Sequence, residues 1–318
     1  MTLDKVAIIP SIGIGDALMM MVASHRLYCQ GYEVTTFSSA IIQLQPWFAP
    51  HQFDQRPSIE RLEETLKDFD LVVFQHENSP FAKALLSLYH DNKLKALSVF
   101  YAKYEEHKHF PLTPLDRVFH EKKPMVDNIA RAISSILGLN HISKNNGLTL
   151  PDHLLHRRYK NRVLIHPTSR AFERVWPQEK FLALAKLLEE EGFCPVFTVS
   201  PEEKPYWDNL LQGLYQVPLF SSLSDFADYA LESGYLIGND SGLGHLCSNL
   251  QIPTLILSNR KKHISLWRPG WYRGDVVTPP WWIPNFKGSR LRERKWYKFI
   301  KPKDVFKKFL RLVSKETF

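Results

Sequence analysis

Short apolar strands alternate with amphipathic helices along most of this 318-residue chain. In the first half the pattern predicts strands over residues 5–10, 32–37, 70–74 and 97–101, and helices over 16–30, 59–67, 80–90 and 124–137. Strands that are separated by helices usually pair in parallel, because each helix returns the chain to the same end of the sheet. The pattern therefore predicts a parallel sheet with helices on both faces.

The same alternation restarts after a polar stretch, residues 140–160, which we interpret as a linker. Beyond it we expect strands over residues 162–166, 194–199, 235–238 and 253–257, and helices over 177–191, 201–212, 224–231 and 242–250. A chain of this length also favours two domains over one. We therefore predict an α/β protein with two Rossmann-like domains facing a central cleft. Ligands of such sheets bind at the carboxyl ends of the strands.

The overall composition is that of an ordinary globular protein. Hydrophobic residues make up 44% and charged residues 23%, which excludes a disordered or fibrous chain. We see no apolar run near the roughly 18 residues of a membrane-spanning helix and expect no signal peptide. The three cysteines, Cys29, Cys194 and Cys247, are far apart, which indicates the reducing cytoplasm rather than a disulfide or zinc framework.

The net charge of +8 is concentrated at the C-terminal end. Residues 256–318 hold 17 of the 41 Lys and Arg residues but four of the 33 Asp and Glu residues. This end therefore carries a net charge of +13 and the remaining chain −5. A basic end on an acidic body suggests an anionic surface or substrate as partner.

The first segment with chemical potential is residues 11–18, Ser-Ile-Gly-Ile-Gly-Asp-Ala-Leu, between the first strand and the first helix. Gly13 and Gly15 let the backbone come close to a ligand. A dinucleotide fingerprint would need a third glycine where Leu18 stands, and an acid after the second strand, where the sequence is Phe-Ser-Ser. What remains is Asp16 in the first turn of a helix, for which a plain helix cap is the simpler interpretation when the segment is taken alone.

The second segment, His-Pro-Thr-Ser-Arg over residues 166–170, follows a strand and is followed by Arg174-Val-Trp-Pro. We expect the hydroxyl and N–H groups of Thr168 and Ser169 to face the cleft. Arg174 adds a planar cation that can grip a phosphate through two hydrogen bonds. An exposed basic loop is an equal alternative for this segment alone.

The third segment, Gly-Asn-Asp-Ser-Gly-Leu-Gly-His over residues 238–245, is the most informative. It joins a strand end to a helix start, so the N–H groups of Ser241, Gly242 and Leu243 would point outward at the positive end of the helix dipole. Asp240 and His245 stand on either side of these amides. The crowding of these residue types favours an anion site over a plain capped helix.

Taken in order, the three segments resemble glycosyltransferase family 9, the heptosyltransferases of Gram-negative lipopolysaccharide assembly. The resemblance runs over about residues 6–270. It consists of the glycine–Asp turn, the Thr-Ser…Arg-x-Trp-Pro block and the Asp-Ser-Gly-x-x-His block, in the order of the family.

The resemblance implies a GT-B fold with an acceptor-binding domain over residues 1–150 and a nucleotide-sugar-binding domain over residues 160–300. It implies that Asp16 is the catalytic base, on the glycine loop of Gly13 and Gly15. The residues implied for the donor are Thr168, Ser169 and Arg174 at the diphosphate, Ser241, Gly242 and Leu243 as helix-start amides, Asp240 as an acidic contact, and His245 as a motif residue with a structural role. The family typically uses ADP-heptose as donor substrate, needs no further cofactor and inverts the anomeric centre. We expect the acceptor to be an anionic, lipid A-linked lipopolysaccharide core.

The expected chemistry needs a base for the acceptor hydroxyl and a stabiliser for the departing diphosphate. Many glycosyltransferases hold a metal ion with an Asp-x-Asp pair, a pattern that Asp68 and Asp70 fit. This pair precedes a predicted strand, which places it at the wrong end of the sheet, so we interpret it as a turn. Arg174, the hydroxyls and the helix dipole then replace the metal.

Residues 258–263, Ser-Asn-Arg-Lys-Lys-His, stand where the family usually has a Gly-Pro-Thr-like turn near the nucleotide. This departure leaves open a donor other than ADP-heptose. Two other classes of protein also stay open: a nucleotide-cofactor oxidoreductase, which the missing ribose acid disfavours, and a nucleic-acid binder. No nucleic-acid motif accompanies the basic end, so we expect no nucleic-acid partner.

The tail, residues 267–318, combines five tryptophans with many basic residues and ends in an amphipathic helix. We expect this helix, within residues 301–318, to pack back toward the N-terminal domain. The charges have two further interpretations: contact with lipopolysaccharide phosphates, or peripheral contact with the cytoplasmic face of the inner membrane.

Overall fold

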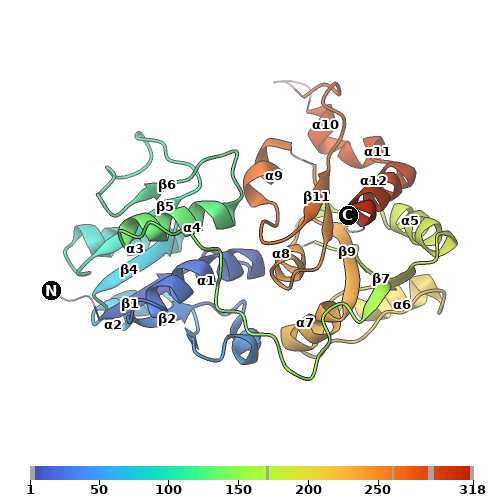
Figure 1. Ribbon diagram of the computed structural model, residues 1–318. Helices are drawn as coiled ribbons and strands as arrows, with labels where there is room; N and C mark the ends of the chain where they lie inside the picture. The colour runs from blue at the N-terminus through green and yellow to red at the C-terminus, as the bar shows by residue number, and fades with distance from the viewer. Residues whose placement is uncertain (1–3, 170–171, 260, 286–289, 316–318) are drawn as a thin grey trace. The chain divides into compact units, whose positions relative to one another are not determined.

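A computed structural model of the chain describes residues 4–169, 172–259, 261–285 and 290–315. The chain divides into two compact units, residues 1–150 and 151–318. Each unit has its own parallel sheet (Figure 1). Among the described residues, none of the helices combines the length and the apolar character needed to span a bilayer.

The first unit is built on a six-stranded sheet with the order β3-β2-β1-β4-β5-β6. Its strands are β1 (Lys5–Ile9), β2 (Glu33–Phe37), β3 (Gln52–Asp54), β4 (Leu71–Gln75), β5 (Leu97–Tyr101) and β6 (Arg117–Val118). Its helices are α1 (Ile14–Tyr28), η1 (Ile42–Phe48), η2 (Ile59–Arg61), α2 (Leu62–Leu66), α3 (Pro80–His90) and α4 (Met125–Ile136). All strand pairs are parallel, as predicted. The short edge strands β3 and β6 were not expected, because two or three residues are too few to show a periodicity.

The second unit is built on a five-stranded sheet with the order β11-β10-β9-β7-β8. Its strands are β7 (Tyr159–His166), β8 (Cys194–Phe197), β9 (Ser233–Asn239), β10 (Thr254–Leu257) and β11 (Gly274–Val277). Its helices are η3 (Phe172–Arg174), α5 (Gln178–Glu190), α6 (Lys204–Leu211), α7 (Leu223–Leu231), α8 (Gly242–Asn249), α9 (Lys261–Trp267), α10 (Leu291–Arg294), α11 (Trp296–Phe299) and α12 (Pro302–Ser314). The tail is thus part of the domain, because it supplies an edge strand and the last helices.

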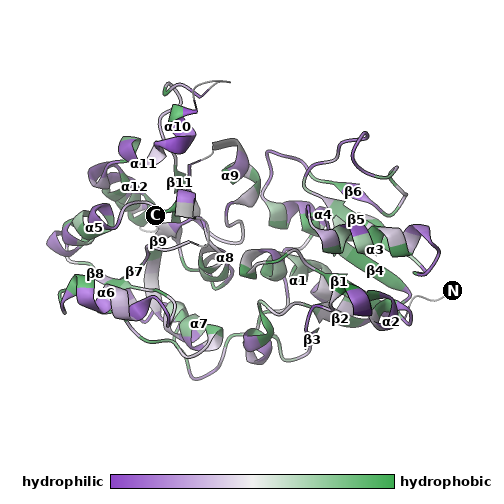
Figure 2. Cartoon of the chain, turned by 180° about the vertical axis from the view of Figure 1, so that it is seen from behind, coloured by the Kyte–Doolittle hydropathy of each residue, from purple (hydrophilic) through white to green (hydrophobic). Residues whose placement is uncertain are grey.

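Local sequence signals explain where several helices begin. Ser79 caps α3 by accepting a hydrogen bond from the Ala82 backbone, and Pro80 follows in the first turn, where its missing N–H costs nothing. Ser222 and Asp225 form a capping box at the start of α7. Figure 2 shows that β1 and β4 are hydrophobic over most of their length, whereas α10 is largely hydrophilic.

The apolar face of α12 is buried in the core of the second unit. Val305, Phe309 and Leu312 are its buried residues, and they join the cluster that contains Phe181 of α5 and Tyr235 of β9. The sequence analysis expected this face to pack toward the N-terminal domain; the residues that it buries belong to the second unit instead. In the fold, α12 contacts α5 and β11 of the second unit, so its apolar face is covered by them.

We predict that Phe309→Ala destabilises the second unit by about 3–5 kcal/mol, the usual cost of removing a buried phenyl ring. The Phe309 ring is fully buried and lies 4.9 Å from the ring of Phe193 and 5.1 Å from that of Tyr235, between centroids. Urea unfolding followed by tryptophan fluorescence measures this change, since Trp47 is the one tryptophan in the first 150 residues. The exposed Lys307→Ala is the control on the same helix, and equal unfolding curves for both variants would contradict the packing.

Candidate functional site

The glycine loop of the first unit places Asp16 at the carboxyl end of β1. Gly13 precedes the first turn of α1, and a Cβ atom built on it would lie 2.9 Å from Asp16 Oδ2. Glycine is needed at position 13 because the Asp16 carboxylate lies where a Cβ atom would come too close. Asp16 Oδ1 accepts a hydrogen bond of 2.6 Å from Nε2 of Gln75, a buried residue at the end of β4. The N-cap residue of α1 is Gly13, and Asp16 lies in the first turn.

Glu77 is the anchor of this loop, and sequence analysis did not single it out. Its carboxylate accepts hydrogen bonds from Ser11 Oγ (2.9 Å), the Ile12 backbone (3.2 Å) and Ser79 Oγ (2.7 Å). It is also paired with Arg56, 2.6 Å between Nη2 and Oε1. Burial raises the pKa of Glu77, but the hydrogen bonds from Arg56, Ser79 and Ser11 outweigh it and lower the pKa. The loop is therefore held by a partly buried carboxylate. The position of Glu77, two residues after the end of β4, was the sequence signal available.

In the second unit, Asn239 ties together the two loops that carry the donor candidates. It is the last residue of β9 and is buried. Its side-chain amide donates to the Pro167 carbonyl (2.8 Å) and accepts from the Trp176 backbone (3.0 Å). The segment between these two contacts contains Thr168, Ser169 and Arg174. Sequence analysis passed over Asn239, although it precedes the Asp-Ser-Gly block directly.

Two tryptophans hold the turn that carries Arg174 against the C-terminal segment. Trp176 Nε1 donates to the Ile300 carbonyl (3.2 Å), and Trp296 Nε1 donates to the Glu173 carbonyl (3.0 Å). Both indoles are buried, so both N–H groups need these partners. The tail thereby fixes the donor side of the unit. Arg170 of the same motif lies outside the described residues.

Arg174 and Asp240 interact electrostatically at the carboxyl ends of β7 and β9. Burial raises the pKa of Asp240 to about 6, and the nearby Arg174 cation opposes this rise. Ser169 Oγ donates to the Asp240 backbone carbonyl (3.4 Å), which keeps the two loops adjacent. An acid with a raised pKa beside a cation is a typical binding-site arrangement.

The start of α8 presents unsatisfied donors beside Asp240. Ser241 is the N-cap residue, and its Oγ is buried and makes no hydrogen bond to the described residues. The N–H groups of Gly242 and Leu243 lie in the first turn, where helical amides have no partner within the helix. Together with the helix dipole, these donors suit a phosphate group.

His245, one turn into α8, is buried and uncharged. Burial lowers its pKa to about 4, although a hydrogen bond to the Trp267 backbone favours the charged form. Its Nδ1 atom makes no hydrogen bond to the described residues. The imidazole packs edge-on against Trp271, 6.4 Å between centroids, which favours a packing role for His245.

The Asp68-Phe69-Asp70 segment lies at the opposite end of the first sheet, as expected. Asp70 Oδ2 accepts from the Asp4 and Lys5 backbones, 3.0 Å each, just before β1 and β4 begin. The hydrogen bond from Lys95, with those two, lowers the pKa of Asp70 to about 2. Within the described ranges, no three His, Cys, Asp or Glu side chains are grouped to hold a metal ion.

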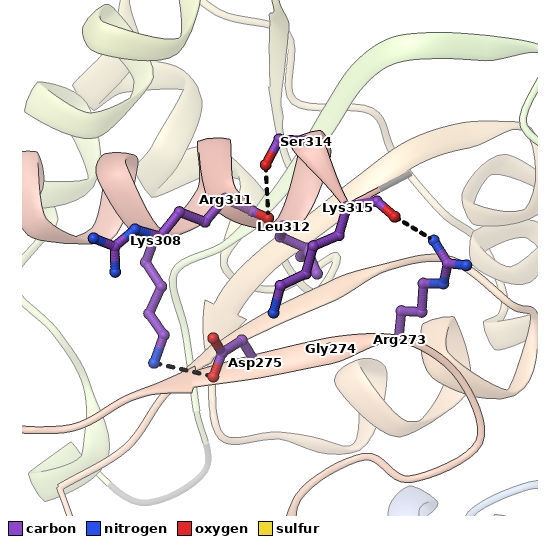
Figure 3. A pocket seen from close by; sticks show the side chains of 8 residues that line it. All are labelled: Arg273, Gly274, Asp275, Lys308, Arg311, Leu312, Ser314 and Lys315. Carbon is purple, nitrogen blue, oxygen red and sulfur yellow. Dashed lines mark hydrogen bonds and ion pairs between the residues drawn. The ribbon is translucent and has the colours of Figure 1, made fainter. Parts of the chain in front are cut away.

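A basic pocket of about 550 Å³ lies elsewhere in the second unit (Figure 3). It is lined by Arg273, Gly274, Asp275, Lys308, Arg311, Leu312, Ser314 and Lys315. Gly274 pairs with Thr254, the first residue of β10, so the pocket lies at the amino ends of the strands. Asp240 and Ser241 follow the carboxyl end of β9, so the pocket is separate from the donor candidates.

Comparisons with known proteins point to one family. The model of glycosyltransferase family 9 (heptosyltransferase) matches residues 104–267. Lipopolysaccharide heptosyltransferase 3 of Escherichia coli K12 is 25% identical over 158 residues, which are 45% of this chain and 44% of that protein. The chain thus matches less than half the length of this curated relative.

Solved structures share the fold over nearly the whole chain. A family 9 glycosyltransferase from Veillonella parvula has a TM-score of 0.72 and 16% identity, covering 99% of each chain. The ADP-heptose lipopolysaccharide heptosyltransferase II of Escherichia coli has a TM-score of 0.69 and 15% identity, covering 99% of this chain and 100% of the other. The predicted GT-B fold with two Rossmann-like units is confirmed. Because the family model covers just over half of its residues, the chain belongs to glycosyltransferase family 9.

Proposed function

We propose that this protein is an inverting, metal-independent glycosyltransferase that moves heptose from ADP-heptose to a lipid A-linked inner-core acceptor of lipopolysaccharide. The observation that carries the proposal is the donor cluster of the second unit: the Arg174 cation, the Thr168 and Ser169 loop, Asp240 and the start of α8. A nucleoside diphosphate matches this cluster in charge, since it brings oxygens that need several N–H and O–H donors.

In the proposed reaction, the first unit binds the acceptor and the second unit binds the donor. Asp16 takes the proton of the acceptor hydroxyl as the oxygen attacks the anomeric carbon. The new carbon–oxygen bond forms as the bond to the diphosphate breaks, and a single displacement of this kind inverts the anomeric centre. Gln75 is the positioning residue, because its amide donates a hydrogen bond to one carboxylate oxygen of Asp16.

Arg174, the hydroxyl groups and the amides of α8 stabilise the negative charge that develops on the departing ADP. The buried Ser241 Oγ supports this role, because it gains a partner when a phosphate oxygen binds. The identity of the nucleotide stays open, because Ser258 and Asn259 stand where the family has its Gly-Pro-Thr-like turn. Both residues are buried. Another nucleotide sugar on the same cluster is the second candidate. Arg260, in the same segment, lies outside the described residues.

A lipid-linked acceptor places the reaction at the cytoplasmic face of the inner membrane. We infer that the protein works in the cytoplasm in peripheral contact with that surface, with the nucleotide sugar and the anionic core as its partners.

We predict that ADP raises the thermal unfolding temperature more than UDP, GDP or CDP, because a ligand stabilises the folded state according to its affinity.

We expect Arg174→Ala to weaken ADP binding about 10- to 100-fold, the loss expected for a hydrogen bond to a charged group. Arg311→Ala, an arginine of the separate basic pocket, is the control and leaves ADP binding unchanged. A preference for UDP or GDP would keep the glycosyltransferase and remove ADP-heptose. If both variants lost the ADP-induced rise in unfolding temperature equally, the assignment of ADP to the donor cluster would be wrong.

We expect Asp16→Asn to lower kcat about 10²- to 10⁴-fold, the usual contribution of a general base. Asp127→Asn is the matched control, since Asp127 is also an acid in the first turn of a first-unit helix, where it pairs with Lys144 at 3.3 Å. Transfer is measured as ADP release from ADP-heptose with a lipid A-linked core acceptor, and ADP affinity by calorimetry. Near-normal turnover of Asp16→Asn would remove its role as base.

Transfer should persist in EDTA at nearly the rate without it, because Arg174 and the α8 amides supply the positive potential at the diphosphate. The measurement compares initial rates with EDTA, with added magnesium and with neither. Loss of transfer in EDTA that magnesium restores would overturn the metal-independent mechanism.

A further inference from the structure

Two adjacent tryptophans project into solvent from the turn that follows β11. Trp281 is 76% exposed and Trp282 is 66% exposed. Tryptophan has one of the largest apolar surfaces of any side chain, so a contiguous exposed pair indicates an interaction surface. The Trp47, Trp176 and Trp296 side chains, in contrast, are fully buried.

Hydrogen bonds and a buried side chain tie this turn to the rest of the second unit. Ile283 is buried beneath it, and its backbone N–H donates to the Pro280 carbonyl (3.2 Å). Arg292 Nη1 donates to the Trp281 carbonyl (2.8 Å), and the Arg292 backbone donates to Pro284 (3.2 Å). The flanking prolines further restrict the backbone. The two indoles are therefore held outward in the absence of a partner.

Cations follow the pair in the sequence, in and around α10 and α11. Residues 279–301 contain seven Lys or Arg and one acid, Glu293, which accepts a hydrogen bond from Asn285 (3.1 Å). The exposed cations in the described part of this stretch are Arg290, Arg294, Lys295, Lys298 and Lys301. Leu291, 42% exposed, adds apolar surface at the start of α10. Figure 1 shows α10 at the outer edge of the second unit and α11 beside α12.

We propose that this tryptophan–lysine/arginine lobe, residues 279–285 and 290–301, docks on an anionic phospholipid surface. The indoles enter the boundary between headgroups and acyl chains, where their apolar rings are covered and their N–H groups stay hydrated. The cations lie at the level of the lipid phosphates and are attracted by the negative surface potential. The lobe gives a location to the peripheral contact of the proposed function, but its binding to lipid needs neither donor nor acceptor.

Charge and shape together favour a lipid surface over a small ligand. Both rings of the pair are exposed, whereas a bound sugar or nucleotide would need a concave site that buries most of its surface. Apolar wedges beside a cluster of cations are the features that hold interfacial segments on anionic bilayers.

The test is co-sedimentation of the full chain with vesicles of phosphatidylcholine alone or mixed with phosphatidylglycerol. We expect binding to the anionic vesicles, little to the neutral ones, and a decrease as salt screens the charges. Trp281→Ser with Trp282→Ser should weaken the partition coefficient about tenfold or more, by loss of buried apolar area. Lys295→Gln with Lys298→Gln should weaken it about fivefold for each cation removed, the equivalent of about 1 kcal/mol per charge.

The control removes exposed apolar residues from residues 205–259, a stretch of the sequence without Lys or Arg. Leu214→Ser with Leu219→Ser deletes side chains that are 76% and 61% exposed in the same unit and should leave vesicle binding unchanged. Brominated lipids provide a second readout, because they should quench the fluorescence of the wild type more than that of the double tryptophan variant. Equal unfolding temperatures establish that the variants are folded.

Vesicle binding that is unchanged in the double tryptophan variant, or equal on neutral and anionic vesicles, would overturn the proposal. A further arm measures transfer to a deacylated, water-soluble core acceptor, which should be equal in the variant and the wild type. A loss of that activity with intact vesicle binding would assign the tryptophans to the acceptor instead. Failure of transfer in the wild type with intact vesicle binding would reject the proposed function and leave the lipid surface standing.

Discussion

The donor side of this protein depends on a single buried amide. Asn239, at the end of β9, accepts from the Trp176 backbone and donates to the Pro167 carbonyl, so it fixes both ends of the loop that carries Thr168, Ser169 and Arg174. Burying a side-chain amide without these partners would lower the free energy of unfolding, so the loop is stabilised in this geometry. The N-cap residue of α8, Ser241, comes two residues after Asn239, so the same strand end carries the amide that holds the Arg174 loop and the start of the helix.

The first unit uses the same device in the equivalent place. Gln75 ends β4, the neighbour of the first strand β1, just as Asn239 ends β9, the neighbour of β7. Its amide holds the loop after β1 through the Ser11 backbone (3.3 Å) and Asp16 (2.6 Å). In each unit a buried amide at the end of the adjacent strand therefore orients the loop with the candidate chemistry. This arrangement follows from a parallel sheet, in which the carboxyl ends of neighbouring strands lie side by side.

The C-terminal segment contributes to the same site from a distance in sequence. Trp296 and Ile300 bond to the turn of Glu173 and Trp176, and α12 covers the outside of α5. The basic tail thus has two sides: an apolar one that completes the second unit and a charged one that remains available to anions. Its amphipathic pattern specified a buried face but not the surface that the face covers, because many apolar surfaces satisfy the same pattern.

The sequence by itself determined the class of fold, the division into two similar halves and the residues Asp16, Arg174 and Asp240 as candidates, because periodicity and strand-to-helix turns are local properties. Only the tertiary structure decided that Gln75, Glu77 and Asn239 hold those candidates, since each partner is far away in the chain and joined by strand pairing. It also decided that Asp70 clamps the amino ends of β1 and β4, and that α12 packs within its own unit. Contacts between distant segments depend on which strands become neighbours, and no local pattern encodes that order.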